Sequence, residues 1–305
     1  MVKKVGRWWL LVALMAVLLF AAGWLAFFYT EVGMAKEIGA GVQEYHLTEC
    51  ELSAIPQSVI DDAAEVAKQV FGDSQDMLRD FKDQLLVTYM ETRDRDVVVV
   101  FNSGGWGGSM IDKTPGWSSI LDGIKSTLDD MGCRSTLLNY RRTSSGLRAC
   151  INEFIEGWGR YPSKAKDLAA RVEFLTEHNP NLRVIVAGES NGTVIADSTM
   201  LILRDNPQVY SIQTGTPFWH KPTPLDRTLL MNSNGKTIDT FSYGNVPAMV
   251  WATVKNWFGL LSKEDNPGTV LSWLRAPGHH YSWQYPGVCS AVVNFLENNF
   301  GAKNK

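Results

Sequence analysis

A serine between two glycines is the feature of this sequence that could carry out chemistry. The segment Gly188-Glu189-Ser190-Asn191-Gly192 follows the apolar run LRVIVAG and precedes residues with helical spacing. A G-x-S-x-G sequence in this position predicts a sharp turn from a strand to a helix, which exposes the serine hydroxyl at the helix N-terminus. The N–H groups there favour developing negative charge. We therefore predict that Ser190 is a nucleophile, with a structural glycine turn as the alternative.

A serine nucleophile needs a base, and the sequence offers only five histidines. His46 lies in the N-terminal part, and His178 ends a predicted helix, where the helix dipole suits it without catalysis. His220 lies in TPFWHKP, where we expect the rim of a pocket. His279 and His280 lie in the loop APGHHYSWQYP, just before the last predicted helix. We predict His279, directly after the glycine, as the base, and His280 as the alternative.

These two motifs resemble those of the α/β-hydrolase superfamily, and the resemblance covers about residues 94–300. It rests on the G-E-S-N-G turn and on the Gly-His-His loop ahead of the final helix. It implies a triad in the chain order Ser, acid, His. It also implies an oxyanion hole built from the N–H of Asn191 and from Gly105 or Trp106, in the loop NSGGWGG after the first strand. This loop lacks the histidine of HGGG-type loops.

The triad acid must lie between the serine turn and the histidine loop. The candidates are Asp197, Asp205, Asp226, Asp239, Glu264 and Asp265. Asp239 follows the apparent strand LLMN and a short loop that contains a glycine, which resembles the arrangement around the acid in many α/β-hydrolases. We predict Asp239 as the acid, with Asp265, in a Glu-Asp-Asn-Pro turn, as the second candidate.

Rival chemistries find little support in the sequence. The loop GGWGGSM lacks the third glycine of a dinucleotide-binding loop, and no lysine follows it closely enough for a Walker A loop. No H-E-x-x-H or clustered metal ligands are present, so we expect neither a metal nor an organic cofactor. A net charge of −3 without a basic cluster gives no indication of nucleic-acid binding. The four scattered cysteines permit disulfides, but free thiols fit their spacing at least as well.

The elements that must position the site alternate between strands and helices. The predicted strands are 96–101, 135–142 and 182–188, with further strands in VYSIQTG and TLLMNS; the predicted helices begin at 162, 191 and 287. Unbroken apolar runs are typical of strands buried on both faces of a sheet. The sequence therefore predicts an α/β fold with a mostly parallel central sheet and helices on both faces. The run LLVTYM near residue 85 fits either a strand or a helix.

The N-terminus predicts one transmembrane helix ahead of this fold. Trp8–Tyr29 contains no charge and no proline, and a spanning helix needs about 20 apolar residues. Lys3, Lys4 and Arg7 precede it, so the positive-inside rule places the N-terminus in the cytoplasm and the catalytic domain outside. We expect a tip and anchor at 1–30, a juxtamembrane helical segment at 31–93 and a catalytic domain at 94–305.

Together these features predict a membrane-anchored serine hydrolase that cleaves an ester, a thioester or a related acyl bond. The expected partners are a small-molecule or lipid-like acyl substrate and the membrane. The alternative is a non-catalytic binding or scaffolding protein on the same fold. The stretch AMVWATVKNWFGLL fits either a lid over an apolar acyl group or ordinary core packing. The exact substrate, acyl transfer to water or to another acceptor, and the oligomeric state stay open at this point.

Overall fold

The computed structural model describes residues 47–72, 75–105, 114–140, 156, 159–261, 267–270 and 273–301. The predicted span Trp8–Tyr29 lies outside these residues, as do Trp106 and Asp265. Within the described part of the chain, no helix is both long enough and apolar enough to cross a bilayer.

A five-stranded sheet forms the centre of the protein. Its strand order is β2-β1-β3-β4-β5, and every neighbouring pair is parallel. This confirms the predicted α/β class with a mostly parallel sheet. The strands are β1 (Val97–Asn102), β2 (Ser135–Asn139), β3 (Arg183–Glu189), β4 (Val209–Thr214) and β5 (Thr228–Met231).

The unbroken apolar runs are explained by cores on both faces of the sheet. Successive side chains of a strand point to opposite faces. In β1, Val98 and Val100 belong to one core and Val97 and Val99 to the other. A strand in this position must therefore be apolar at every residue.

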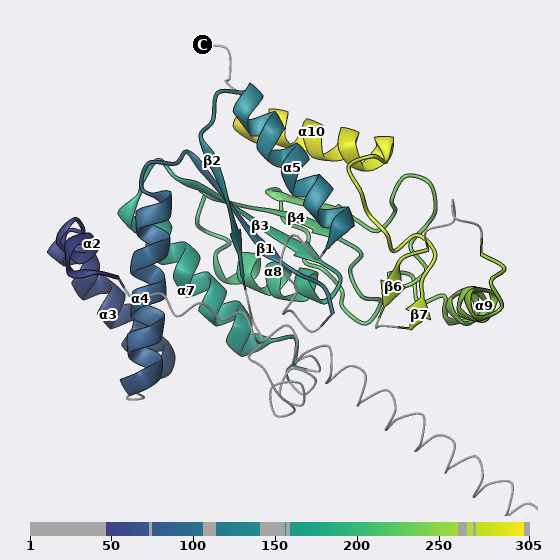
Figure 1. Cartoon of the computed structure of the whole chain (residues 1–305), viewed down its shortest axis with the longest axis horizontal. Helices are drawn as coiled ribbons and strands as arrows, with labels where there is room; N and C mark the ends of the chain where they lie inside the picture. The colour runs from purple at the N-terminus through teal and green to yellow at the C-terminus, as the bar shows by residue number, and fades with distance from the viewer. Residues whose placement is uncertain are drawn as a thin grey trace, which may run out of the picture.

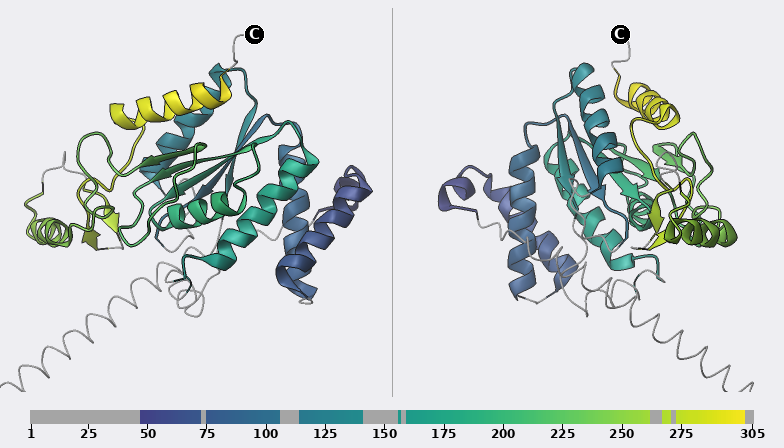
Figure 2. Two further views of the ribbon diagram at one scale, coloured as in Figure 1. Left: turned by 180° about the vertical axis from the view of Figure 1, so that it is seen from behind. Right: turned by 45° about the vertical axis from the view of Figure 1, so that its right-hand side comes forward.

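Two pairs of helices cover these faces (Figures 1 and 2). α5 (Pro115–Asp130) and α10 (Pro286–Phe300) pack together on one face. α7 (Pro162–His178) and α8 (Asn191–Ile202) pack on the other. Three of these four helices carry proline at their first positions, where its missing N–H has no helical partner to lose.

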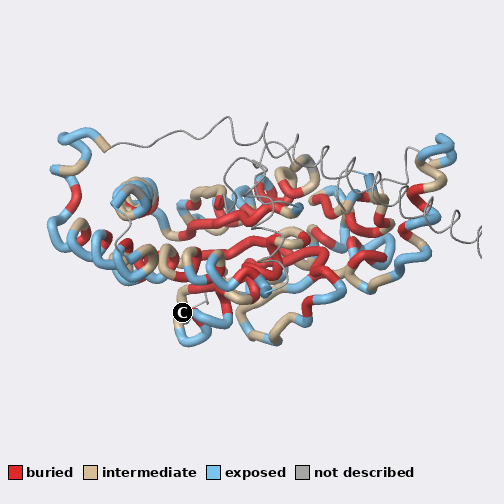
Figure 3. Tube along the Cα trace, turned by 90° about the horizontal axis from the view of Figure 1, so that it is seen from below, coloured by how far each residue is buried: buried red, intermediate tan, exposed pale blue. Residues whose placement is uncertain are grey.

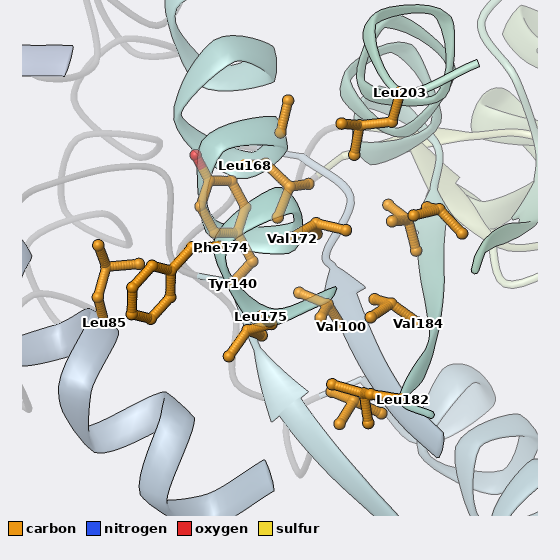
Figure 4. Packing of buried hydrophobic residues seen from close by; sticks show 14 of the residues in the cluster. Leu85, Val100, Tyr140, Leu168, Val172, Phe174, Leu175, Leu182, Val184 and Leu203 are labelled. Atoms are coloured by element: carbon orange, nitrogen blue, oxygen red, sulfur yellow. The ribbon is translucent and has the colours of Figure 1, made fainter. Parts of the chain in front are cut away.

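A helical hairpin extends the second face outward. After the single turn α2 (Glu49–Ser53), α3 (Gln57–Phe71) and α4 (Gln75–Thr92) pack on each other and on α7. The ambiguous LLVTYM run is part of α4, and its Leu85 joins the core that also holds residues of α7 and the sheet (Figure 4). The predicted division near residue 93 stays a prediction, while the hairpin and the sheet share one core.

A small lobe lies at the far end of the molecule from this hairpin (Figure 1). We call it the α9 lobe: residues 240–261, 267–270 and 273–276, with α9 (Val246–Trp257) and the antiparallel pair β6 (Thr269–Val270) and β7 (Leu274–Arg275). It has its own small core around Phe241, Met249 and Ala276. Other buried residues belong to the two cores that flank the sheet, and Figure 3 shows buried residues running through the middle of the molecule.

The cysteines form no disulfide among the described residues. Cys50, Cys133 and Cys289 are free, and Cys150 lies outside the described part of the chain.

Candidate active site

The carboxyl ends of the central strands meet at one edge of the sheet. Asn102 at the end of β1 pairs with Gly188, and Glu189 at the end of β3 pairs with Thr214 at the end of β4. Thr214 in turn pairs with Met231, the last residue of β5. The loops that follow these strands therefore share one edge, which is where open parallel sheets bind their ligands.

Ser190 lies in the predicted sharp turn between β3 and α8. Its backbone has φ 50° and ψ −121°, a conformation that is costly for a residue with a side chain. The Ser190 N–H donates to the carbonyl of Thr214 at 2.9 Å, which holds the turn against the end of β4. The flanking glycines are required. A Cβ at Gly188 would lie 2.8 Å from the Gly192 carbonyl oxygen, and one at Gly192 would collide with the Asn102 carbonyl.

His279 and Asp239 form a buried pair close to this turn. Nδ1 of His279 lies 2.8 Å from Oδ2 of Asp239, and both side chains are almost fully buried. Gly278, with φ 83°, permits the loop to pass close to the backbone of Asp239, where a Cβ would collide. A Cβ at Gly215 would lie 2.7 Å from Cε1 of His279. Because Gly215 follows Thr214, the imidazole lies against the strand end that also holds Ser190.

A set of hydrogen bonds keeps the Asp239 carboxylate in place. Oδ2 also accepts from the Tyr281 hydroxyl at 2.9 Å and from Ser242 Oγ at 3.0 Å. Oδ1 accepts from the N–H of Phe241 at 2.9 Å and of Ser242 at 3.2 Å, an Asx turn. Ser242 and Tyr281 were not predicted from the sequence; their local signals are a serine three residues after the acid and an aromatic residue two after the histidine.

These contacts set the protonation of the acid. Burial raises the pKa of Asp239, but the hydrogen bond and positive charge of His279, with the hydrogen bonds of Tyr281 and Ser242, lower it by more. The net effect is a pKa below the usual value, so Asp239 is a carboxylate at neutral pH. Burial, together with the charge of Asp239, raises the pKa of Tyr281 well above its usual range. Tyr281 therefore stays a hydroxyl and a hydrogen-bond donor.

His280 points to different neighbours. Its ring packs 5.8 Å from that of Tyr285, between centroids, and it lies so close to Gly116 that a Cβ there would be 3.1 Å from Cε1. Burial lowers the pKa of His280, and the charge of His279 adds to this effect. Of the two histidines in the loop, His279 is the one that the fold brings to Asp239.

The residues predicted for the oxyanion hole flank the serine turn. Asn191 begins α8, and the N–H groups of a first helical turn have no partner within the helix. Its side-chain Nδ2 donates to the Gly105 carbonyl at 3.3 Å, which ties the two predicted donors together. Gly104 approaches closely: a Cβ there would lie 3.2 Å from Cβ of Ser190. Trp106 lies outside the described residues.

A second buried histidine–aspartate pair was not foreseen. Nε2 of His220 lies 3.0 Å from Oδ2 of Asp197, and both side chains are almost fully buried. Oδ1 of Asp197 accepts from the N–H of Thr223 at 3.0 Å. The predicted pocket-rim position of His220 is therefore wrong. The pair joins the middle of α8 to the loop after β4.

The parallel sheet with helices on both faces, the strained serine turn and the chain order of Ser190, Asp239 and His279 agree with the pattern that the resemblance to α/β-hydrolases implies. No protein-family model and no curated protein matches the sequence. Among solved structures, the chain is similar to a Trichoderma reesei cutinase in complex with a C11Y4 phosphonate inhibitor. The sequence identity is 14% and the TM-score 0.39, over 80% of this chain and 94% of that chain. A likeness of this size indicates nothing about the reaction.

Proposed function

We propose that this protein is a membrane-anchored serine hydrolase that cleaves an ester, a thioester or a related acyl bond. One observation carries the proposal: the strained turn of Ser190 lies at the same strand ends as the buried His279–Asp239 pair. A nucleophile, a base and an orienting acid are the groups that acyl transfer through an acyl-enzyme requires. This chemistry uses no metal ion or organic cofactor.

Each residue has a defined task in the proposed reaction. Ser190 Oγ attacks the carbonyl carbon while Nε2 of His279 takes its proton, and the imidazole then returns the proton to the leaving group. Asp239 accepts the Nδ1–H hydrogen bond and so fixes the tautomer in which Nε2 has a free lone pair. The hydrogen bond between Ser190 Oγ and Nε2 belongs to the proposal, and substrate binding is expected to draw these atoms together.

The remaining steps need an oxyanion hole and a water molecule. The N–H of Asn191, with that of Gly105 or Trp106, would bind the oxyanion of the tetrahedral intermediate. Water would then attack the acyl-enzyme and return the hydroxyl of Ser190. An alcohol or amine in place of water would make the same site an acyltransferase, which product analysis distinguishes.

A fluorophosphonate probe tests the proposal directly, because it labels only an activated serine. We expect the wild-type protein to be labelled and to hydrolyse activated esters, and Ser190→Ala to lose both. Ser198→Ala, a half-buried serine on the same helix, is the matched control and should behave like wild type. Absence of labelling in a folded wild-type protein would instead favour the non-catalytic binding or scaffolding role.

The choice of base has its own test. His279→Ala should lose nearly all turnover, whereas His280→Ala should lose much less, because only His279 contacts Asp239. The reverse ranking in ester hydrolysis, with both variants folded, would transfer the role to His280.

The cellular location is part of the same proposal. The apolar run Trp8–Tyr29, preceded by Lys3, Lys4 and Arg7, supports a single anchor with a cytoplasmic N-terminus and an extracytoplasmic catalytic domain. Protease added to sealed, right-side-out cells should then digest the domain. Full protection of the domain in intact cells, with digestion after lysis, would refute this orientation.

A further inference from the structure

The exposed apolar side chains of the described residues gather in one region. Eleven of the fifteen large hydrophobic residues that are exposed belong to the α9 lobe, to the turn before it or to the tip of the loop after β4. They are Phe218, Trp219, Ile238, Tyr243, Val246, Val250, Trp251, Trp257, Phe258, Leu260 and Trp273. Monomeric soluble proteins rarely expose so many apolar groups together, and such surfaces mark interaction sites.

The inner and outer faces of α9 have different tasks. Met249, Ala252 and Thr253 are buried, and Thr253 Oγ1 accepts from the N–H of Arg275, which fixes the helix to β7. The outer face carries Trp251, 61% exposed, and Trp257, 67% exposed. Among the described residues, the small core of the lobe holds Phe241, Met249 and Ala276, and the two tryptophans do not belong to it.

The chemistry of this surface is that of a membrane interface. Residues 240–261 contain no acidic side chain and a single basic one, Lys255, whose Nζ lies 5.5 Å from the ring of Trp251. Tryptophan, tyrosine and phenylalanine favour the headgroup region of a bilayer, and a lysine beside them suits its anionic surface.

The predicted N-terminal anchor would hold the domain close to a bilayer. Trp8–Tyr29 is long and apolar enough to span a membrane, and residues 30–46 connect it to the first described residue. Figure 1 places α2 and α9 at opposite ends of the molecule. Fully extended, this connection reaches up to about 60 Å, whereas a compact domain of this size is about 45 Å across. The tether therefore permits the α9 lobe to face the membrane.

The surface is also continuous with the candidate active site. Phe241 packs edge-on to the imidazole of His279, with ring centroids 4.9 Å apart. Phe218 and Trp219, each about half exposed, pack against Phe241 at 6.2 and 5.3 Å. An apolar path of side chains thus leads from the outer surface to the proposed base.

From these observations we propose that the α9 lobe docks on the bilayer that holds the anchor, and that the substrate is an ester dissolved in that bilayer. The inference rests on the proposed function. It adds that the substrate enters the site from the bilayer and not from water. Docking places Phe218 and Trp219 at the headgroup level, so an acyl chain can move along them toward His279 without crossing water.

Photo-cross-linking to lipid tests the docking without any need for catalysis. The full-length protein is reconstituted in phosphatidylcholine–phosphatidylglycerol vesicles that contain a phosphatidylcholine with a diazirine in its acyl chain, and adducts are mapped by mass spectrometry. We expect adducts on peptides from 246–261 as well as from 8–29. The triple variant Trp251→Ser, Trp257→Ser, Phe258→Ser should lose the first set and keep the second.

A matched control uses Leu201→Ser with Ile202→Ser, two exposed apolar residues at the end of α8, which should keep both sets of adducts. Adducts confined to 8–29 in the wild type would overturn the proposal. A dimer in detergent that the triple variant abolishes, without lipid adducts on 246–261, would assign the surface to a second copy of the chain. Fluorophosphonate labelling of each variant reports the serine separately, so failure of the function and failure of the docking are distinguishable.

Discussion

Replacing Asp239 with asparagine should leave a folded protein that can no longer use its histidine as a base. The carboxylate receives donors at both oxygens: two backbone N–H groups at Oδ1, and His279, Tyr281 and Ser242 at Oδ2. The backbone donors are fixed, so the carbonyl oxygen of an asparagine would take the Oδ1 position. Its NH2 group would then face the imidazole.

Two donors cannot share a hydrogen bond, so the imidazole must respond. His279 would place its lone pair on Nδ1 and its proton on Nε2, the tautomer that cannot accept a proton from Ser190. In the best-studied serine triad this change lowers turnover about 10⁴-fold, or about 5 kcal/mol of activation free energy. We expect a loss of that order here. Substrate binding should change little, because Asp239 is fully buried.

The assay compares kcat and KM for a soluble activated ester in Asp239→Asn and in Asp226→Asn, an exposed aspartate that serves as control. Circular dichroism confirms that both variants fold. Near-normal turnover of Asp239→Asn would refute the assignment of the acid. If Asp265→Asn were inactive at the same time, the role would pass to Asp265.

Three further substitutions give separate expectations. Tyr281→Phe keeps the ring but removes one hydrogen-bond donor to Asp239. We expect turnover to fall about tenfold, because a hydrogen bond to a charged group contributes about 1.5–3 kcal/mol. An unchanged kcat would contradict this expectation. His280→Gln should flatten the pH dependence of the melting temperature. The folded state lowers the pKa of His280, so stability is full above about pH 6.5 and is lost as the pH falls through the lowered value. His220→Ala should lower the free energy of unfolding by about 1–3 kcal/mol in urea titrations, because it leaves the Asp197 carboxyl buried without its partner; a neutral effect would show that water replaces the imidazole.

The sheet and the serine turn could be predicted because each requires particular residue types at closely spaced positions. Val97–Val100 must be apolar at every position to fill two cores, and that requirement is visible as an unbroken run. Gly188 is required by the close carbonyl of Gly192, and Gly192 by the carbonyl of Asn102 at the end of β1; both glycines lie two residues from Ser190. In each case the constrained residues lie close together in the chain, so the constraint is visible as a short sequence pattern.

Other features produce no short sequence pattern, because only their packing decides them. The LLVTYM run is too short for its period to separate a strand from a helix, and only packing of α4 on α3 and α7 decides it. The stretch around Trp251 has helical spacing, which fits a core helix as well as it fits a lid over an acyl group. The structure places Met249 inside and Trp251 outside, and this depends on how α9 packs on β7.

The two buried histidine–aspartate pairs consist of the same residue types but lie at different places in the fold. Their side chains are alike in burial, and their hydrogen bonds differ by 0.2 Å in length, at 2.8 and 3.0 Å. Asp197 lies seven residues after Ser190, two turns along α8, so its pair with His220 lies away from the strand ends. Asp239 and His279 come from loops at the edge where β3 and β4 end, beside the backbone that carries Ser190. Because a proton can be passed only over hydrogen-bond distance, the place of a pair on the sheet, and not its chemistry, decides which histidine can serve the serine.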